Sequence, residues 1–157
     1  MTGDEAIRVS GTVSVDRSIF GLDELRREGE EARPFWTDLP MDGAPVMVGH
    51  GIARILSRAQ SHDVSVVVEV RGGLPDGPGE GFELLGSWRY RTGSGDQLVC
   101  TVDGPALTFR LREDSGYMLH VWRRGGDTAA ARFAELMGQV YPVTGLEEYL
   151  FAFTPDS

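Results

Sequence analysis

Three histidines and one cysteine are the residues of this chain whose side chains most readily bind metals or act as bases and nucleophiles. They are His50, His62, Cys100 and His120, and they are scattered along the chain. Zinc sites bring such ligands together at short spacings, for example two histidines one helical turn apart or a Cys-x-x-Cys pair. No such spacing occurs in this sequence. We therefore predict no protein-built metal site and no cofactor.

His120 is followed by an aromatic residue and two arginines in the segment His120-Val-Trp122-Arg-Arg124. A base, an aromatic stacking surface and guanidinium groups can together bind an anion. One interpretation is therefore a small-molecule-binding or enzymatic β domain that uses His120, Trp122 and Arg124. The other interpretation is a histidine packed between sheets, with the arginines at the solvent end of its strand.

Common catalytic motifs are missing from the sequence. Gly86-Ser-Trp-Arg lacks the second glycine that a strained nucleophile turn needs. All 15 basic residues are arginines, which excludes a lysine Schiff base and a phosphate-binding loop that ends in lysine. Cys100 lies among apolar neighbours in Leu98-Val-Cys-Thr-Val102, a context that favours a buried, unreactive thiol. The absence of a coherent catalytic set favours a protein without enzymatic activity.

A stretch of acidic and aromatic residues at about 21–44 is the stronger candidate for function. It interrupts the strand pattern, and a long loop inside a compact domain is often functional. Acidic groups steer the approach of a basic protein, and aromatic rings supply buried anchor residues. The alternative is a solvated loop whose aromatic residues cover the core. The residues that we assign to partner binding are Asp23, Glu24, Glu28, Glu30, Glu31, Phe35, Trp36, Asp38 and Asp42.

Alternation of apolar and polar residues predicts the elements that position these side chains. In residues 62–71, Val64, Val66, Val68 and Val70 alternate with mostly polar residues, which is the pattern of a strand with one buried face. Similar patterns predict further strands over residues 7–16, 46–56, 82–90, 96–102, 106–112, 117–122 and 147–153. We therefore predict an all-β fold, mainly an antiparallel β-sandwich of about eight strands, with a closed barrel as the runner-up.

One short C-terminal helix is predicted over residues 127–139, because Phe133, Leu136, Met137 and Val140 have the spacing of one helical face. Asp127 or Thr128 could cap this helix.

Length and charge limit the number of domains and the kinds of partner that we expect for this chain. Its 157 residues are expected to form a single domain, and 24 acidic against 15 basic residues give a formal net charge of −9. This charge argues against direct binding of nucleic acid, which depends on positive side chains that neutralise phosphates. A single cysteine excludes an intrachain disulfide, and no segment approaches the ~18 consecutive apolar residues of a membrane helix. We predict a cytoplasmic protein that does not bind membranes.

Three short segments also carry a family resemblance. They are Gly51-Ile-Ala-Arg-Ile, Ser115-Gly-Tyr-Met-Leu-His-Val-Trp122 and Glu148-Tyr-Leu-Phe-Ala-Phe-Thr-Pro155. In their order along the chain they resemble small bacterial β-sandwich proteins of the competence J type, which are inhibitors of a DNA-entry nuclease. The resemblance implies a cytosolic inhibitor or immunity-type protein without catalysis of its own. It supplies no individual functional residues.

The acidic charge, the missing catalytic set and this resemblance together favour a non-catalytic binding protein. We expect an inhibitor or immunity-type protein that engages a basic protein partner such as a nuclease or toxin. Two alternatives remain at this stage: the small-molecule-binding or enzymatic domain described above, and a structural subunit of a homo-oligomer.

Overall fold

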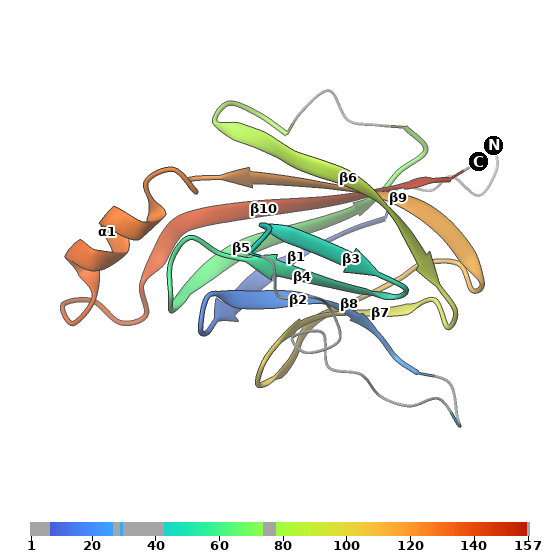
Figure 1. Ribbon diagram of the computed structural model, residues 1–157, viewed down its shortest axis with the longest axis horizontal. Helices are drawn as coiled ribbons and strands as arrows, with labels where there is room; N and C mark the ends of the chain where they lie inside the picture. The colour runs from blue at the N-terminus through green and yellow to red at the C-terminus, as the bar shows by residue number, and fades with distance from the viewer. Residues whose placement is uncertain (1–6, 27–28, 30–42, 74–77, 157) are drawn as a thin grey trace.

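Two five-stranded β-sheets and one short helix form the fold of the computed structural model, which describes residues 7–26, 29, 43–73 and 78–156 (Figure 1). In spatial order, the first sheet contains β1 (Ile7–Val15), β5 (His62–Val70), β10 (Thr144–Pro155), β9 (Ser115–Arg124) and β6 (Phe82–Thr92). The second contains β3 (Val46–Gly49), β4 (Ile52–Leu56), β2 (Ile19–Glu24), β7 (Asp96–Thr101) and β8 (Gly104–Arg110). The structure confirms the all-β prediction and the sandwich of two sheets.

Pairing within the sheets is antiparallel except between β5 and β10. These two strands run parallel because the chain leaves β9, forms α1 (Ala129–Leu136) and returns as β10 between β5 and β9. β10 is therefore a central strand with neighbours on both sides. Its position explains why residues on both of its faces are buried.

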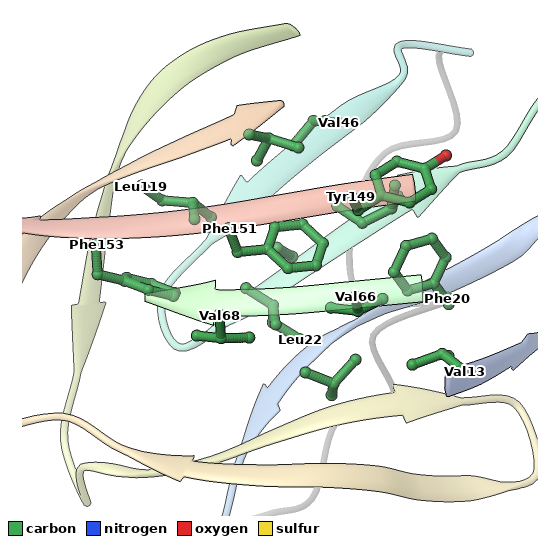
Figure 2. Close-up of a cluster of buried hydrophobic side chains, with 14 of the residues drawn as sticks. Val13, Phe20, Leu22, Val46, Val66, Val68, Leu119, Tyr149, Phe151 and Phe153 are labelled. Carbon is green, nitrogen blue, oxygen red and sulfur yellow. The ribbon is translucent and has the colours of Figure 1, made fainter. Parts of the chain in front are cut away.

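Aromatic residues of β10 form the centre of the core (Figure 2). Tyr149, Phe151 and Phe153 alternate along β10 and point towards the second sheet, where Phe20 and Leu22 of β2 meet them. The ring of Phe20 packs edge-on against Tyr149, with 5.0 Å between the ring centroids. Burying each such side chain contributes about 1.5–3 kcal/mol, so these contacts hold the two sheets together.

The structure differs from the sequence prediction at β2 and at β3–β4. Residues 19–24 form a strand, whereas the prediction began the excursion at Gly21. Glu24 occupies the next inward position after Phe20 and Leu22, and this polar residue hides the apolar alternation. The segment predicted as one strand over 46–56 is a hairpin that turns at His50 and Gly51. The described residues therefore contain ten strands rather than about eight.

A bulge between Leu84 and Gly86 in β6 reverses which alternate side chains point towards the core and which point outward. Phe82, Leu84, Trp88 and Tyr90 share one parity in the sequence, which would place them on one face. The extra residue of the bulge reverses this pattern. Trp88 and Tyr90 face the core, whereas Phe82 and Leu84 pair with the outward residues of β9.

Helix α1 is shorter than the predicted range of 127–139. Thr128 stands at the N-cap position, but its side chain makes no capping hydrogen bond. The helix packs through Ala129 and Phe133 against Val143 and Leu146. Within the described ranges, no helix has the length and apolarity needed to span a membrane.

The two ends of the sandwich differ in their elements (Figure 1). The end that carries α1, the start of β5 and the start of β10 is called the helix end below. The opposite end carries the β6–β7 turn at residues 93–95 and the β8–β9 loop at residues 111–114, and it is called the loop end.

Candidate functional site

Ser57, His62 and Glu147 come together at the helix end, although they lie far apart in the sequence. The Ser57 hydroxyl donates a hydrogen bond to Glu147 Oε1 at 2.6 Å. It therefore accepts the bond from His62 Nε2, 2.7 Å away, and the ring carries its proton on that nitrogen. His62 Nδ1 has no partner among the described residues. A catalytic triad needs the opposite arrangement, with the acid at Nδ1 and the serine donating to Nε2.

Burial also closes this cluster to a substrate, because the side chains of His62 and Glu147 are 0 % exposed. The Glu147 carboxylate additionally accepts hydrogen bonds from the Arg58 backbone N–H at 3.0 Å and from the Tyr149 hydroxyl at 2.8 Å. Desolvation lowers the pKa of His62, which favours the neutral ring. The cluster ties β10 to the turn between β4 and β5. We assign it a structural role.

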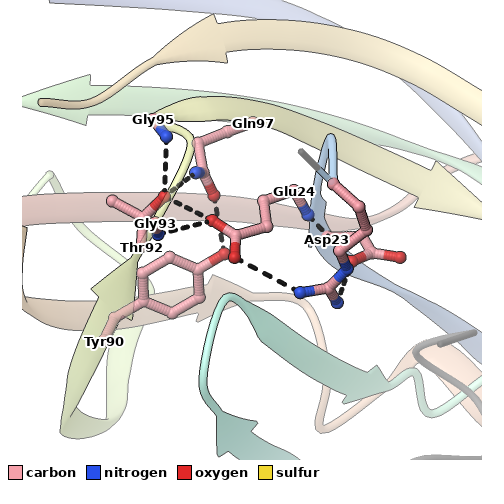
Figure 3. A network of polar contacts seen from close by, with 8 residues as sticks. Asp23, Glu24, Tyr90, Thr92, Gly93, Gly95 and Gln97 are labelled. Atoms are coloured by element: carbon pink, nitrogen blue, oxygen red, sulfur yellow. Dashed lines mark hydrogen bonds and ion pairs between the residues drawn. The ribbon is translucent and has the colours of Figure 1, made fainter. Parts of the chain in front are cut away.

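A second buried carboxylate, Glu24, lies at the loop end (Figure 3). Glu24 Oε2 accepts hydrogen bonds from the Thr92 hydroxyl and from the Gly93 backbone N–H, the latter at 3.0 Å. Thr92 Oγ1 in turn accepts hydrogen bonds from the Gly95 N–H at 3.0 Å and from the Gln97 side-chain amide at 2.8 Å. The end of β2 is thereby joined to the β6–β7 turn. Although it was predicted as a partner-binding residue, Glu24 points into the fold.

Asp23 and Arg26 extend the Glu24 network towards solvent. Arg26 donates to Asp23 Oδ1 at 2.9 Å and to Glu24 Oε1 at 3.3 Å. Burial raises the pKa of Asp23, and its hydrogen bonds with the Glu24 N–H and Arg26 oppose this rise. Gly51 packs against the Glu24 carboxylate. A Cβ at position 51 would lie 2.4 Å from Glu24 Oε1, and the backbone at Gly51 has φ +67°. These contacts fix the point at which the acidic segment leaves β2.

The remaining residues of the predicted partner surface lie outside the described residues, and their assignment stays a prediction. They are Glu28, Glu30, Glu31, Phe35, Trp36, Asp38 and Asp42.

His120 is placed on the outward face of β9, where it bridges three strands. Its Nδ1 lies 2.6 Å from Ser87 Oγ of β6, and its Nε2 lies 3.0 Å from Thr154 Oγ1 of β10. Desolvation lowers the pKa of His120. Because both ring nitrogens are engaged by hydroxyl groups, this histidine does not present a free base to a ligand.

Arg124 lines a groove of about 490 Å³ on the outer face of the first sheet. Its guanidinium lies over the Phe82 ring, 4.9 Å from the centroid, and pairs with Glu148. His120 and Trp122 are not part of the described lining of this groove. The three residues predicted to form one ligand pocket therefore share a face of β9 but not a cavity.

The other predicted chemical residues are not brought together. Cys100 is buried, as predicted, and desolvation raises the pKa of its thiol to about 12, which disfavours the thiolate. His50 is exposed in the turn between β3 and β4. The described part of the chain contains no group of three or more histidine, cysteine or acidic side chains that could hold a metal ion.

Sequence reasoning missed the Ser57–His62–Glu147 cluster and the inward orientation of Glu24. Each glutamate continues a strand's apolar alternation: Glu24 follows Phe20 and Leu22, and Glu147 precedes the inward aromatic residues of β10. A charged residue at an inward position was the available signal.

The two packed sheets, with β10 at the centre of one, define a β-sandwich that is shared with solved structures. ComJ from Bacillus subtilis, an inhibitor of the DNA degrading activity of NucA, is similar with a TM-score of 0.63 and 10% identity, covering 99% of this chain and 100% of that chain. The crocagin biosynthetic gene J product is similar with a TM-score of 0.57 and 12% identity, covering 98% and 99%. No protein-family model matches the chain. The resemblance to the competence J type is thus confirmed for the fold.

Proposed function

We propose that this protein is an inhibitor-type binding protein that engages a protein partner. The observation that carries the proposal is the fold shared with ComJ, a nuclease inhibitor, over 99% of this chain. The buried Ser57–His62–Glu147 cluster supports it further, because the residue types suited to catalysis are engaged inside the fold.

The net charge of −9 supports a partner with a basic surface. A protein that cleaves nucleic acid binds phosphates through positive side chains. An acidic protein is attracted to the same surface and can occupy it in place of the nucleic acid. We therefore propose a basic nuclease or toxin as the partner class.

The acidic segment that begins at Asp23 is the proposed contact. The Glu24 network fixes the start of this segment at the loop end, while Asp23 is only partly buried there. We assign the steering role to the acids that follow in the sequence, and the anchoring role to Phe35 and Trp36.

Capture from native lysate on the immobilised chain, followed by an activity assay on the captured protein, tests this function. We expect a partner whose cleavage of DNA, or other toxic activity, is lost in proportion to the added protein until the two are equimolar. Retention of full activity by every captured protein would overturn the proposal. So would the absence of any captured protein together with a defined metabolite retained by the purified chain.

A further inference from the structure

A groove of about 640 Å³ opens at the loop end, and it shares Arg71 with the neighbouring groove that Arg124 lines. The end of β5, the β8–β9 loop and the end of β10 form its sides. This size lies within the range of binding sites for small ligands and peptide side chains.

The groove is lined by three arginines, Arg71, Arg110 and Arg112. Arg110 pairs with Asp96 and Glu113, and Arg71 lies 3.8 Å from Glu69. The exposed guanidinium of Arg112 makes no hydrogen bond or ion pair with the described residues. Its planar set of N–H donors, suited to bidentate binding of a carboxylate, is therefore available to a ligand.

The sides of the groove are held in place before any ligand binds. The backbone N–H of Arg112 donates to the Tyr117 hydroxyl at 3.0 Å. The neighbouring residue Leu111 donates its N–H to the Gly95 carbonyl at 2.8 Å, and Asp114 donates to the Gly93 carbonyl at 2.9 Å. Because Glu24 fixes the turn that contains both glycines, the Glu24 network also positions Arg112.

Apolar side chains line the same groove. Ile7, Val70, Tyr117 and Pro155 contribute to its lining, and Ile7 is 40% exposed. A ligand that fits this groove combines an anionic group with an apolar body. A free inorganic anion would leave the apolar lining in water.

We propose that this groove binds a peptide segment in which a glutamate or aspartate carboxylate is flanked by apolar side chains. Arg110 and Arg71 are already paired with acids, and Asp156 is paired with Arg89 at 3.6 Å. Among the described residues that line the groove, Arg112 therefore supplies the one positive charge without a partner. The single excess positive charge suits a singly charged carboxylate better than a doubly charged phosphate. This site recognises acids and does not depend on the proposed function, in which the chain's own acids meet a basic partner.

Fluorescence polarisation with a labelled, C-terminally amidated hexapeptide of alternating glutamate and leucine tests the proposal. We expect saturable binding that becomes about ten-fold weaker in Arg112→Gln, because a charge-assisted hydrogen-bond pair is lost. The matched control is Arg132→Gln on α1, an exposed arginine at the helix end that should bind the peptide like the unmodified chain. Arg112 is exposed, so the melting temperature should stay unchanged.

Backbone NMR on the labelled protein supplies a second measurement. The peptide should shift the amide signals of Ser115 and Gly116, which line the groove. Equal binding of a glutamine–leucine peptide, or equal binding by Arg112→Gln, would overturn the proposal. Displacement of the peptide by an equal concentration of inorganic phosphate would likewise show a general anion site and contradict it.

Discussion

The two ends of the sandwich each contain a buried glutamate, but the two carboxylates have different surroundings. Glu147 at the helix end accepts hydrogen bonds from Ser57, Tyr149 and a backbone N–H, and it lies beside the neutral ring of His62. The side chains of His62 and Glu147 are closed to solvent. Glu24 at the loop end is bound by Thr92 and Gly93 but also pairs with Arg26, which leads to the surface.

This difference shows why residue type alone does not identify a functional site. The helix end has the three residue types of a catalytic triad, yet their order of hydrogen bonds and their burial give them a structural role. The described network at the loop end contains an acid and a hydroxyl but no histidine, and it positions charged groups at the surface. We therefore propose the loop end as the place where a partner binds.

Removing the carboxylate at the helix end should have the largest effect. Glu147→Ala leaves the Ser57 and Tyr149 hydroxyls and the Arg58 N–H without their buried acceptor, and we expect the free energy of unfolding to fall by about 3–5 kcal/mol. Urea denaturation measures this change. The neighbouring Glu148→Ala, which removes a half-exposed ion pair with Arg124, should cost less than about 1 kcal/mol. Equal losses in both variants would contradict the structural role of Glu147.

Removing the carboxylate at the loop end should have a smaller effect on stability. Glu24→Ala leaves the Thr92 hydroxyl and the Gly93 N–H without an acceptor next to the surface, where water can replace part of the loss. We expect a fall of about 2–3 kcal/mol in the free energy of unfolding, measured by the same urea titration. The variant should also weaken peptide binding in the arginine groove. Unchanged peptide affinity would show that the Glu24 network does not position the arginine groove.

The sequence predicted most of the strands because the apolar alternation in strands such as β1 and β5 reflects burial of one face. It did not predict β2, where Glu24 stands at an inward position, or the reversal of faces in β6, which depends on one extra residue at the bulge. The Ser57–His62–Glu147 cluster depends on contacts between residues about 90 positions apart, a tertiary feature that local patterns do not contain.

Trp36 tests whether the segment after Glu24 contacts a partner. If its ring is a buried anchor, Trp36→Ala should speed dissociation from the captured partner and cost about 2 kcal/mol of binding, with no change in melting temperature. Surface plasmon resonance and thermal unfolding measure the two quantities. Trp122→Ala, on the outward face of β9, is the control and should leave dissociation unchanged. A lower melting temperature with unchanged dissociation would instead assign Trp36 to the core.

Acid should reduce stability through the two buried histidines. Desolvation lowers the pKa of His62 and of His120 in the folded protein below the ordinary histidine value of about 6.5. As the pH falls below 6.5, the unfolded chain takes up protons before the folded chain does, so stability is full above this pH and is lost below it. Each histidine adds a slope of at most about 1.4 kcal/mol per pH unit.

Urea titrations at pH 7.5, 6.5 and 5.5 measure this slope. His120→Gln should flatten it, whereas His50→Gln, which changes an exposed histidine, should not. If the unmodified chain and both variants show the same slope, burial of His120 does not cause it.

Reversal of three acids tests the central claim, recognition of a basic partner by the acidic segment, most directly. Glu28→Arg, Glu30→Arg and Glu31→Arg are combined in one chain, and the association rate with the captured partner is measured at low and at high salt. The account predicts slower association at low salt and a smaller difference at high salt, where ions screen the charges. An affinity at low salt equal to that of the unmodified chain would contradict it.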